Sequence, residues 1–165
     1  MFGEYFHNDR NAFRNKTLRY EQPLNALTLD RLVVITTRSS ASASELVINA
    51  LRPFMPVLVV GDRTYGKPVG QYAIPFCDKV LAPVSFTVRN ANGEGDYFDG
   101  IAPTCPAPDD LDHGLGDPQE GSLREAIALI LTGQCSPSSP AGLAPSRRRF
   151  DLPVSNGWQG LVGAQ

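Results

Sequence analysis

The segment SSASASE, residues 39–45, has the residue types of a nucleophilic serine site. Small residues beside a serine permit a sharp turn with a projecting hydroxyl, and a helix that begins there has free backbone N–H groups in its first turn. Together with the helix dipole, these donors stabilise the oxyanion of an acyl-transfer intermediate. The segment therefore predicts a nucleophile elbow, although the G-x-S-x-G form is absent. A serine-capped helix start without catalysis uses the same residues and stays open as an alternative.

The serine needs a group that takes its proton. His7 lies in a polar segment and His113 in the loop DDLDH, so neither histidine is favoured as the base. A lysine serves when it is uncharged, which requires apolar surroundings. Of the three lysines, Lys67 alone follows a predicted buried strand parallel to the one that carries the serines. Both loops then emerge at one edge of the sheet, and Gln71 is placed to hold the amine.

Two binding motifs compete for residues of this chain. Gly61 to Lys67 satisfies the G-x-x-x-x-G-K form of a phosphate-binding loop. Pro68 argues against it, because that motif needs Ser or Thr for Mg²⁺ and a free N–H at this position. A second candidate is an acidic loop beside His113, which lacks calcium or zinc spacing, so a solvated loop is favoured. Its acidic residues are Asp109, Asp110, Asp112, Asp117 and Glu120.

Hydrophobic patterning predicts the elements that must position the two loops. Residues 31–37 form an apolar run of strand length, residues 42–54 have a helical apolar face, and residues 57–61 form a second buried strand. Two such strands flanking one helix predict a right-handed βαβ unit with a parallel pair, and hence an α/β fold. The apolar face of the helix comprises Leu46, Val47, Ala50, Leu51 and Phe54.

Later residues predict one more strand and one more helix. Residues 79–90 alternate weakly as a strand does, and the turn-rich stretch NANGEGDY follows. Ser122 and Glu125 form a capping box for a helix that Gly133 ends. Its apolar face comprises Leu123, Ala126, Ile127, Ile130 and Leu131.

Composition bounds the class of protein. The 165 residues are one average domain, with 42% hydrophobic and 19% charged residues, which excludes wholesale disorder. A net charge of -2 gives no reason to expect nucleic acid, and Arg147 to Arg149 predict a solvated tail. No apolar run approaches the roughly 18 residues of a membrane span. The charged beginning of the chain has no export signal.

Three cysteines, Cys77, Cys105 and Cys135, show no CxxC spacing. In an oxidising compartment we expect Cys105 to pair with Cys135, because they lie just before and just after a helix that folds back. Three buried thiols are the open alternative.

SASASE followed by VLVVGDRTYGKPVGQ resembles the catalytic core of the C-terminal processing (tail-specific) serine peptidases, whose fold is of the crotonase and Clp-protease-like group. The resemblance implies that Ser42 is the nucleophile and that Lys67, 25 residues later, is the general base. It further implies Gln71 as the partner of the lysine, the Ala43 amide as an oxyanion donor and Glu45 in a supporting role.

The resemblance also implies a larger enzyme. Residues 31–135 correspond to the C-terminal half of a catalytic core, the polar and irregular residues 1–30 continue from an upstream part, and residues 136–165 are a Pro/Ser/Gly-rich tail. The family's upstream oxyanion strand and a PDZ-like segment are absent from residues 1–30, and Thr104 replaces the acid of the family's G-I-x-P-D stretch. The expected substrate is a polypeptide, in the periplasm or cell envelope, with no cofactor. A non-catalytic binding or structural module that retains the fold is the alternative.

Overall fold

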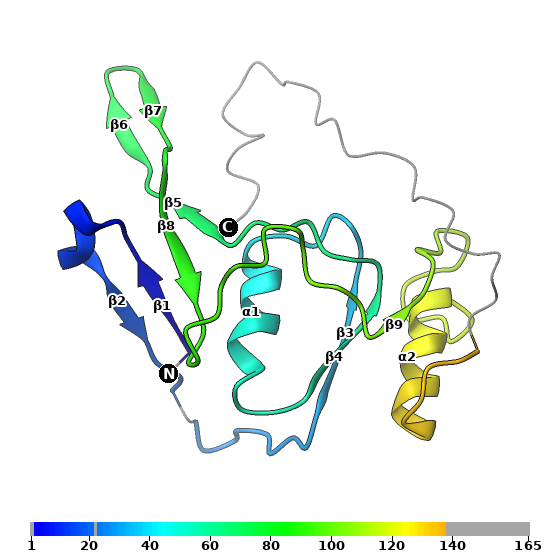
Figure 1. The fold of residues 1–165 in the computed structure, drawn as a ribbon. Coiled ribbons are helices and arrows are strands. Elements are labelled where there is room, and N and C mark those ends of the chain that lie inside the picture. Colours follow the sequence, from blue (N-terminus) through cyan, green and yellow to red (C-terminus); the bar gives the residue numbers. More distant parts are fainter. Residues whose placement is uncertain (1, 22, 138–165) are drawn as a thin grey trace.

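The structure is a computed structural model that describes residues 2–21 and 23–137 (Figure 1). These residues form nine strands, one 3-10 helix and two α-helices, and the predicted tail beyond residue 137 lies outside them. No helix in the described ranges is long and apolar enough to span a membrane. The elements are β1 (Gly3–Phe6), a 3-10 helix (Asp9–Arg14), β2 (Lys16–Leu18), β3 (Leu32–Thr36), α1 (Ala43–Leu51), β4 (Val57–Gly61), β5 (Val69–Gln71), β6 (Ile74–Phe76), β7 (Lys79–Leu81), β8 (Val84–Arg89), β9 (Cys105–Pro106) and α2 (Gly121–Thr132).

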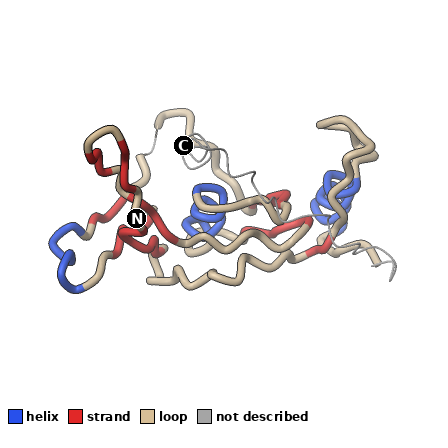
Figure 2. Tube along the Cα trace, turned by 90° about the horizontal axis from the view of Figure 1, so that it is seen from above, coloured by secondary structure: helices blue, strands red, loops and turns tan. Residues whose placement is uncertain are grey.

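A parallel three-stranded sheet with the order β3-β4-β9 forms the centre of the molecule. β3 and β4 pair in register from Leu32 opposite Val57 to Thr36 opposite Gly61, and α1 connects them. This arrangement confirms the predicted parallel βαβ unit and the α/β class. In Figure 2 this unit lies between the antiparallel strands at one end of an elongated molecule and α2 at the other.

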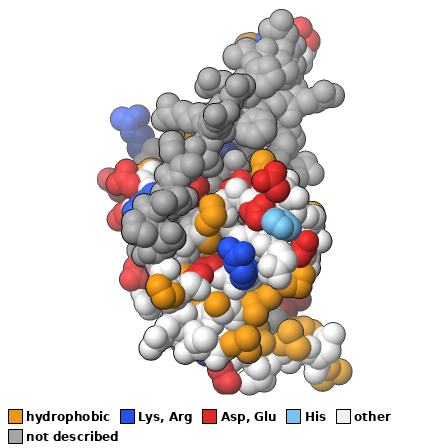
Figure 3. Space-filling view, turned by 90° about the vertical axis from the view of Figure 1, so that its right-hand side faces the viewer, with side chains coloured by type: hydrophobic (Ala, Val, Ile, Leu, Met, Phe, Trp, Pro, Cys, Tyr) orange, Lys and Arg blue, Asp and Glu red, His pale blue; other side chains and the backbone are white. Residues whose placement is uncertain are grey.

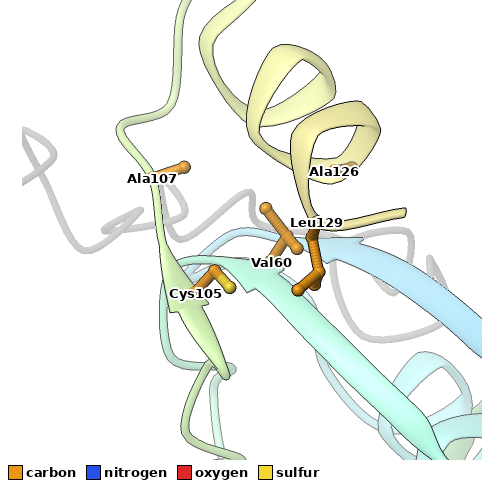
Figure 4. Packing of buried hydrophobic residues seen from close by; sticks show 5 residues of the cluster. All are labelled: Val60, Cys105, Ala107, Ala126 and Leu129. Carbon is orange, nitrogen blue, oxygen red and sulfur yellow. The ribbon is translucent and has the colours of Figure 1, made fainter. Parts of the chain in front are cut away.

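Adjacent residues of β4 face two different hydrophobic clusters, because side chains alternate along a strand. Val59 packs in a cluster that includes Ile48 of α1, whereas Val60 packs in a cluster that includes α2. Figure 4 shows the second cluster, in which the residues of α2 cover β4 and β9. Its buried members are Val60, Cys105, Ala107, Ala126 and Leu129.

The prediction that the first thirty residues are irregular is wrong for residues 3–18. They form β1, the 3-10 helix and β2, and β1 pairs antiparallel with both β2 and β8 in a sheet of order β2-β1-β8-β5. Tyr5 packs its ring on Phe86 of β8 at a centroid distance of 4.4 Å. Strands of three or four residues are too short for a periodic pattern, and their stabilising partner is remote in the sequence.

The helical faces differ from those predicted. In α1, Ile48 is buried while Val47 is exposed, and Phe54, predicted on the same helical face, is exposed beyond the end of the helix at Leu51. In α2, the predicted Ile127, Ile130 and Leu131 are exposed and Leu129 is buried instead. An apolar stripe wider than the contact with the sheet leaves its margins in solvent, and the face in Figure 3 accordingly shows hydrophobic side chains among charged ones.

Glu120, rather than the predicted Ser122, caps α2. Its carboxylate accepts hydrogen bonds from the N–H groups of Ser122 (3.0 Å) and Leu123 (2.6 Å). Ser122 is buried and its hydroxyl donates to the carbonyl of Pro108 at 3.2 Å. The predicted end of this helix is confirmed, because Gly133 adopts a left-handed conformation and donates to the carbonyl of Leu129.

A disulfide joins Cys105 of β9 to Cys135 beyond α2, which confirms the expected pairing, and Cys77 is a free and exposed thiol. The disulfide fastens the helix to the strand that pairs with β4. It closes a loop with a sequence separation of 30 residues.

Replacing Cys135 with alanine is expected to lower the free energy of unfolding of the oxidised protein by about 3 to 4 kcal/mol, because the loop gains freedom in the unfolded chain. Urea denaturation measures the change. Cys77→Ala is the matched control and should leave the midpoint in place. A midpoint equally unaffected by both substitutions would contradict a stabilising cross-link.

Candidate active site

Ser42 lies in a strained turn between β3 and α1. Its backbone has φ 53° and ψ -110°, a region of backbone conformation that residues other than glycine rarely adopt. It immediately precedes the first residue of α1 and is half-buried. The sharp turn expected for SSASASE is therefore present, and it occurs at the residue that the resemblance implies as the nucleophile.

The first turn of α1 presents a free backbone donor beside Ser42. Leu46 N donates to Ser42 O at 2.8 Å and Ser44 N donates to Ala41 O at 3.1 Å. No described residue accepts a hydrogen bond from Ala43 N. This N–H group, at the positive end of the helix dipole, is available to a negatively charged oxygen.

Glu45 joins the turn before α1 that contains Ser42 to the loop between β4 and β5, residues 62–68, which we call the lysine loop. Its side chain is fully buried and accepts four hydrogen bonds. Oε2 accepts from the N–H groups of Ser42 (2.9 Å) and Lys67 (2.8 Å). Oε1 accepts from the hydroxyl of Thr64 (2.5 Å) and the N–H of Gly66 (2.7 Å). One carboxylate thus fixes the backbone of both candidate catalytic residues.

Further contacts hold the two loops together at one edge of the sheet. Tyr65 N donates to Ser40 O at 2.9 Å, and Asp62 N donates to Thr36 O at 2.9 Å. An ion pair joins Arg38 to Asp62 at 3.3 Å. The prediction that the loops after β3 and β4 emerge side by side is confirmed.

The side chain of Lys67 is half-buried, and no hydrogen bond joins its Nζ to Ser42 Oγ in the described part of the chain. Pro68, which follows it, is buried and leads directly into β5 rather than a helix. Gln71 is exposed and its Nε2 donates to Ala82 O at 2.6 Å. The structure therefore brings the backbones of Ser42 and Lys67 together, while Gln71 lies along β5 with its amide held elsewhere.

Residues 96–101 pack against the lysine loop. Gly66 has φ 92°, and a Cβ there would lie 2.2 Å from Phe98 O, so this loop requires glycine. A Cβ on Gly100 would likewise lie 2.1 Å from Thr64 O. Burial, together with the charge of Glu45, raises the pKa of Tyr97 to about 12. The segment DYFDGI is thus part of the site's framework.

The two histidines lie away from this site in the hydrogen-bond network. His7 is buried, where its ring contacts the hydroxyl of Tyr72 (3.1 Å) and Asn15 Oδ1 (3.2 Å). His113 pairs with Asp110 at 2.8 Å. Desolvation raises the pKa of Asp110, but its hydrogen bonds and the contact with His113 lower it more, so the pKa lies below its usual range.

Within the described residues, the side chains grouped closely enough to hold a metal ion are those of Cys105, Glu125 and Cys135. The disulfide leaves neither sulfur as a thiolate ligand.

Thr104, which replaces an acid in the resemblance, accepts a hydrogen bond from Val59 N at 3.1 Å through its hydroxyl.

Sequence reasoning missed Thr64 as a member of the site. Its hydroxyl contacts both Glu45 and the N–H of Ile101, two residues that are remote from it in the sequence. Its place three residues before Lys67 was the available signal, but a threonine in a loop has no pattern that specifies a buried role.

Comparison with known proteins identifies relatives. The family model described as peptidase family S41 matches residues 4–107. Among solved structures, a Bacteroides fragilis protein assigned to the S41 proteases has a TM-score of 0.69 and 27% identity, covering 80% of this chain and 36% of its own. The chain therefore spans about a third of that protein.

Two further structures are similar over smaller parts. A lipoprotein from Streptococcus agalactiae is 17% identical with a TM-score of 0.51, covering 63% of this chain and 39% of its own. A photosystem II D1 C-terminal processing protease is 31% identical with a TM-score of 0.39, covering 44% of this chain and 19% of its own. No curated protein matches the chain.

Proposed function

Because the chain belongs to peptidase family S41, we propose that it carries the nucleophile and base of a serine endopeptidase of the C-terminal processing type. Its substrate is a polypeptide, cleaved through an acyl-enzyme. The observation that carries the proposal is the buried carboxylate of Glu45, which accepts hydrogen bonds from the backbone N–H groups of both Ser42 and Lys67. Such an arrangement holds two loops in a fixed relation, as a Ser/Lys dyad requires.

In the proposed mechanism the uncharged amine of Lys67 takes the proton of the Ser42 hydroxyl as Oγ attacks the carbonyl carbon of the scissile peptide bond. The N–H of Ala43 stabilises the resulting oxyanion. The tetrahedral intermediate collapses, and the ammonium of Lys67 gives its proton to the leaving amine. Water, deprotonated by the same lysine, then releases the carboxylate product and restores the serine.

The side chain of Lys67 must approach Ser42 for this chemistry. A lysine has four rotatable side-chain bonds, and catalytic hydrogen bonds are often loose before the substrate binds. Gln71 is proposed to hold the amine through its side-chain carbonyl. This role fits the contact with Ala82, because that contact uses Nε2 and leaves Oε1 available.

We also propose that the site is completed by a part of the protein outside this chain. The chain spans 36% of the Bacteroides fragilis protein, and the resemblance places a second oxyanion donor and a PDZ-like segment upstream. A crotonase or Clp-like fold for residues 31–135, with residues 1–30 as the continuation of an upstream part, belongs to the same proposal. So does a location in the periplasm or cell envelope.

A fluorophosphonate probe tests the proposed nucleophile. Such a probe phosphonylates an activated serine, with loss of fluoride, and mass spectrometry then locates the adduct. We expect the adduct on Ser42 after prolonged incubation, and none on Ser42→Ala.

Ser44→Ala is the matched control, because Ser44 is an exposed serine two residues further on, and its labelling should equal that of the unmodified sequence. A folded protein that includes the proposed upstream part and whose Ser42 still stays unmodified would instead favour a non-catalytic binding or structural module.

A further inference from the structure

We infer that Thr64 is a positioning residue of this site, an inference that rests on the proposed function. Its hydroxyl holds the Glu45 carboxylate in the orientation that fixes the backbones of Ser42 and Lys67 together. Thr64 is 4% exposed and lies inside the loop between β4 and β5. It links the hydrophobic core to the catalytic loops.

The direction of the two hydrogen bonds at Thr64 follows from their partners. The N–H of Ile101 is a donor, so the threonine oxygen accepts from it at 2.7 Å. The hydroxyl hydrogen is then free to point at Glu45 Oε1, which accepts at 2.5 Å. Because Thr64 N also donates to Ile101 O at 3.1 Å, the residue is held at both its backbone and its side chain.

The terminal torsion of a glutamate side chain is broad, so a carboxylate needs contacts that select one orientation. Each oxygen of Glu45 serves two donors, and Oε2 serves Ser42 and Lys67 at once. Thr64 and the N–H of Gly66 occupy Oε1. Without the hydroxyl, a single contact remains on Oε1 and the rotation of the carboxylate is less restricted.

The other partner of Thr64 belongs to the core. Ile101 is buried in the cluster that contains Ile48, Val57 and Val59, so its N–H has a fixed position. The path from packed core to catalytic loops therefore runs through Ile101, Thr64 and Glu45. Loss of the Thr64 hydroxyl displaces the reacting groups relative to each other and so lowers kcat rather than raising KM.

Amide hydrogen exchange followed by NMR tests this role without requiring turnover. In Thr64→Val, which keeps the shape and removes the hydroxyl, we expect the amides of Ser42, Gly66 and Lys67 to exchange on the order of tenfold faster. Thr64→Ser should restore their protection. Unchanged exchange at all three amides in Thr64→Val would overturn the inference.

Ser122→Ala is the matched control, because Ser122 is equally buried and its hydroxyl donates to Pro108 O at 3.2 Å, remote from the two loops. It should leave the three amides protected. If Thr64→Val does not fold, Thr64→Cys, whose thiol is a weaker donor, takes its place with the same expected change.

The rate at which the fluorophosphonate modifies Ser42 provides the functional readout. Thr64→Val is expected to react about a hundredfold more slowly, and Thr64→Ser near the original rate. The two measurements separate the two proposals. With the proposed upstream part present, protected amides without labelling of the unmodified sequence count against the proposed function. A Thr64→Val protein with unchanged amide exchange or an unchanged labelling rate counts against positioning by Thr64.

Discussion

Replacing Lys67 with methionine is expected to lower the rate of Ser42 acylation by about 10⁴- to 10⁶-fold, the range for losing a member of a catalytic unit. Methionine keeps the unbranched chain and removes the amine. The serine hydroxyl then keeps its proton at neutral pH and attacks poorly. The measurement is the rate of phosphonylation of Ser42 by the fluorophosphonate.

Lys79→Met is the control for this prediction. Lys79 is exposed on β7, in the hairpin beyond β5, and the site does not include it. The same chemical change there should leave the labelling rate unchanged. The fold should survive Lys67→Met, since the contacts that hold this residue are made by its N–H group. Undiminished labelling in a folded Lys67→Met protein would exclude the lysine as general base.

Replacing Glu45 with glutamine is expected to lower the free energy of unfolding by about 3 kcal/mol or more, because the side chain is fully buried and accepts four hydrogen bonds. Glutamine has the same shape, but its amide nitrogen is a donor. It faces two of the four donors without accepting from either, and leaving donors unsatisfied beside a fully buried side chain is costly. The rate of Ser42 acylation should fall as well, because the two loops lose their common hydrogen-bond acceptor. Urea denaturation measures the loss of stability.

Glu94→Gln makes the same change on an exposed side chain. Glu94 Oε2 accepts from the side-chain amide of Asn90 at 2.8 Å, a contact that a glutamine oxygen also makes. We expect a change within about 0.5 kcal/mol, as for ordinary surface positions. A Glu45→Gln protein as stable as Glu94→Gln would show that the four contacts contribute little to folding.

The sequence predicted the central part of the fold well because its strands are continuous apolar runs. Residues 31–37 and 57–61 have that pattern, and the parallel pairing follows from the helix between them. The antiparallel sheet was beyond prediction, since β1 and β2 are short and partly exposed, and β1 depends on pairing with β8. Which side of each helix is buried was also unpredictable, because the shape of the sheet decides how much of an apolar stripe it covers.

For the candidate site, the residue types predicted a serine turn and favoured Lys67, and the resemblance implied Ser42 and Glu45. The topology of parallel strands explains why their loops meet. The four hydrogen bonds to Glu45 were not predictable, since two of them come from backbone N–H groups 21 and 22 residues further along the chain. Thr64 and Ile101 were missed for the same reason. Their roles depend on the path of residues 96–101, which the pattern of side chains does not encode.

The dependence of the lysine loop on Ile101 also has a consequence for protein synthesis. A nascent chain that has emerged through β4 and β5 contains Ser42 and Lys67, yet Thr64 still lacks the backbone partner that Ile101 provides. The loop is therefore completed only after the ribosome has released residues 96–101. Because domains acquire their structure as units while they are made, we expect the proposed reactive centre to assemble only after residues 96–101 have joined the domain, so that shorter nascent chains lack an organised site.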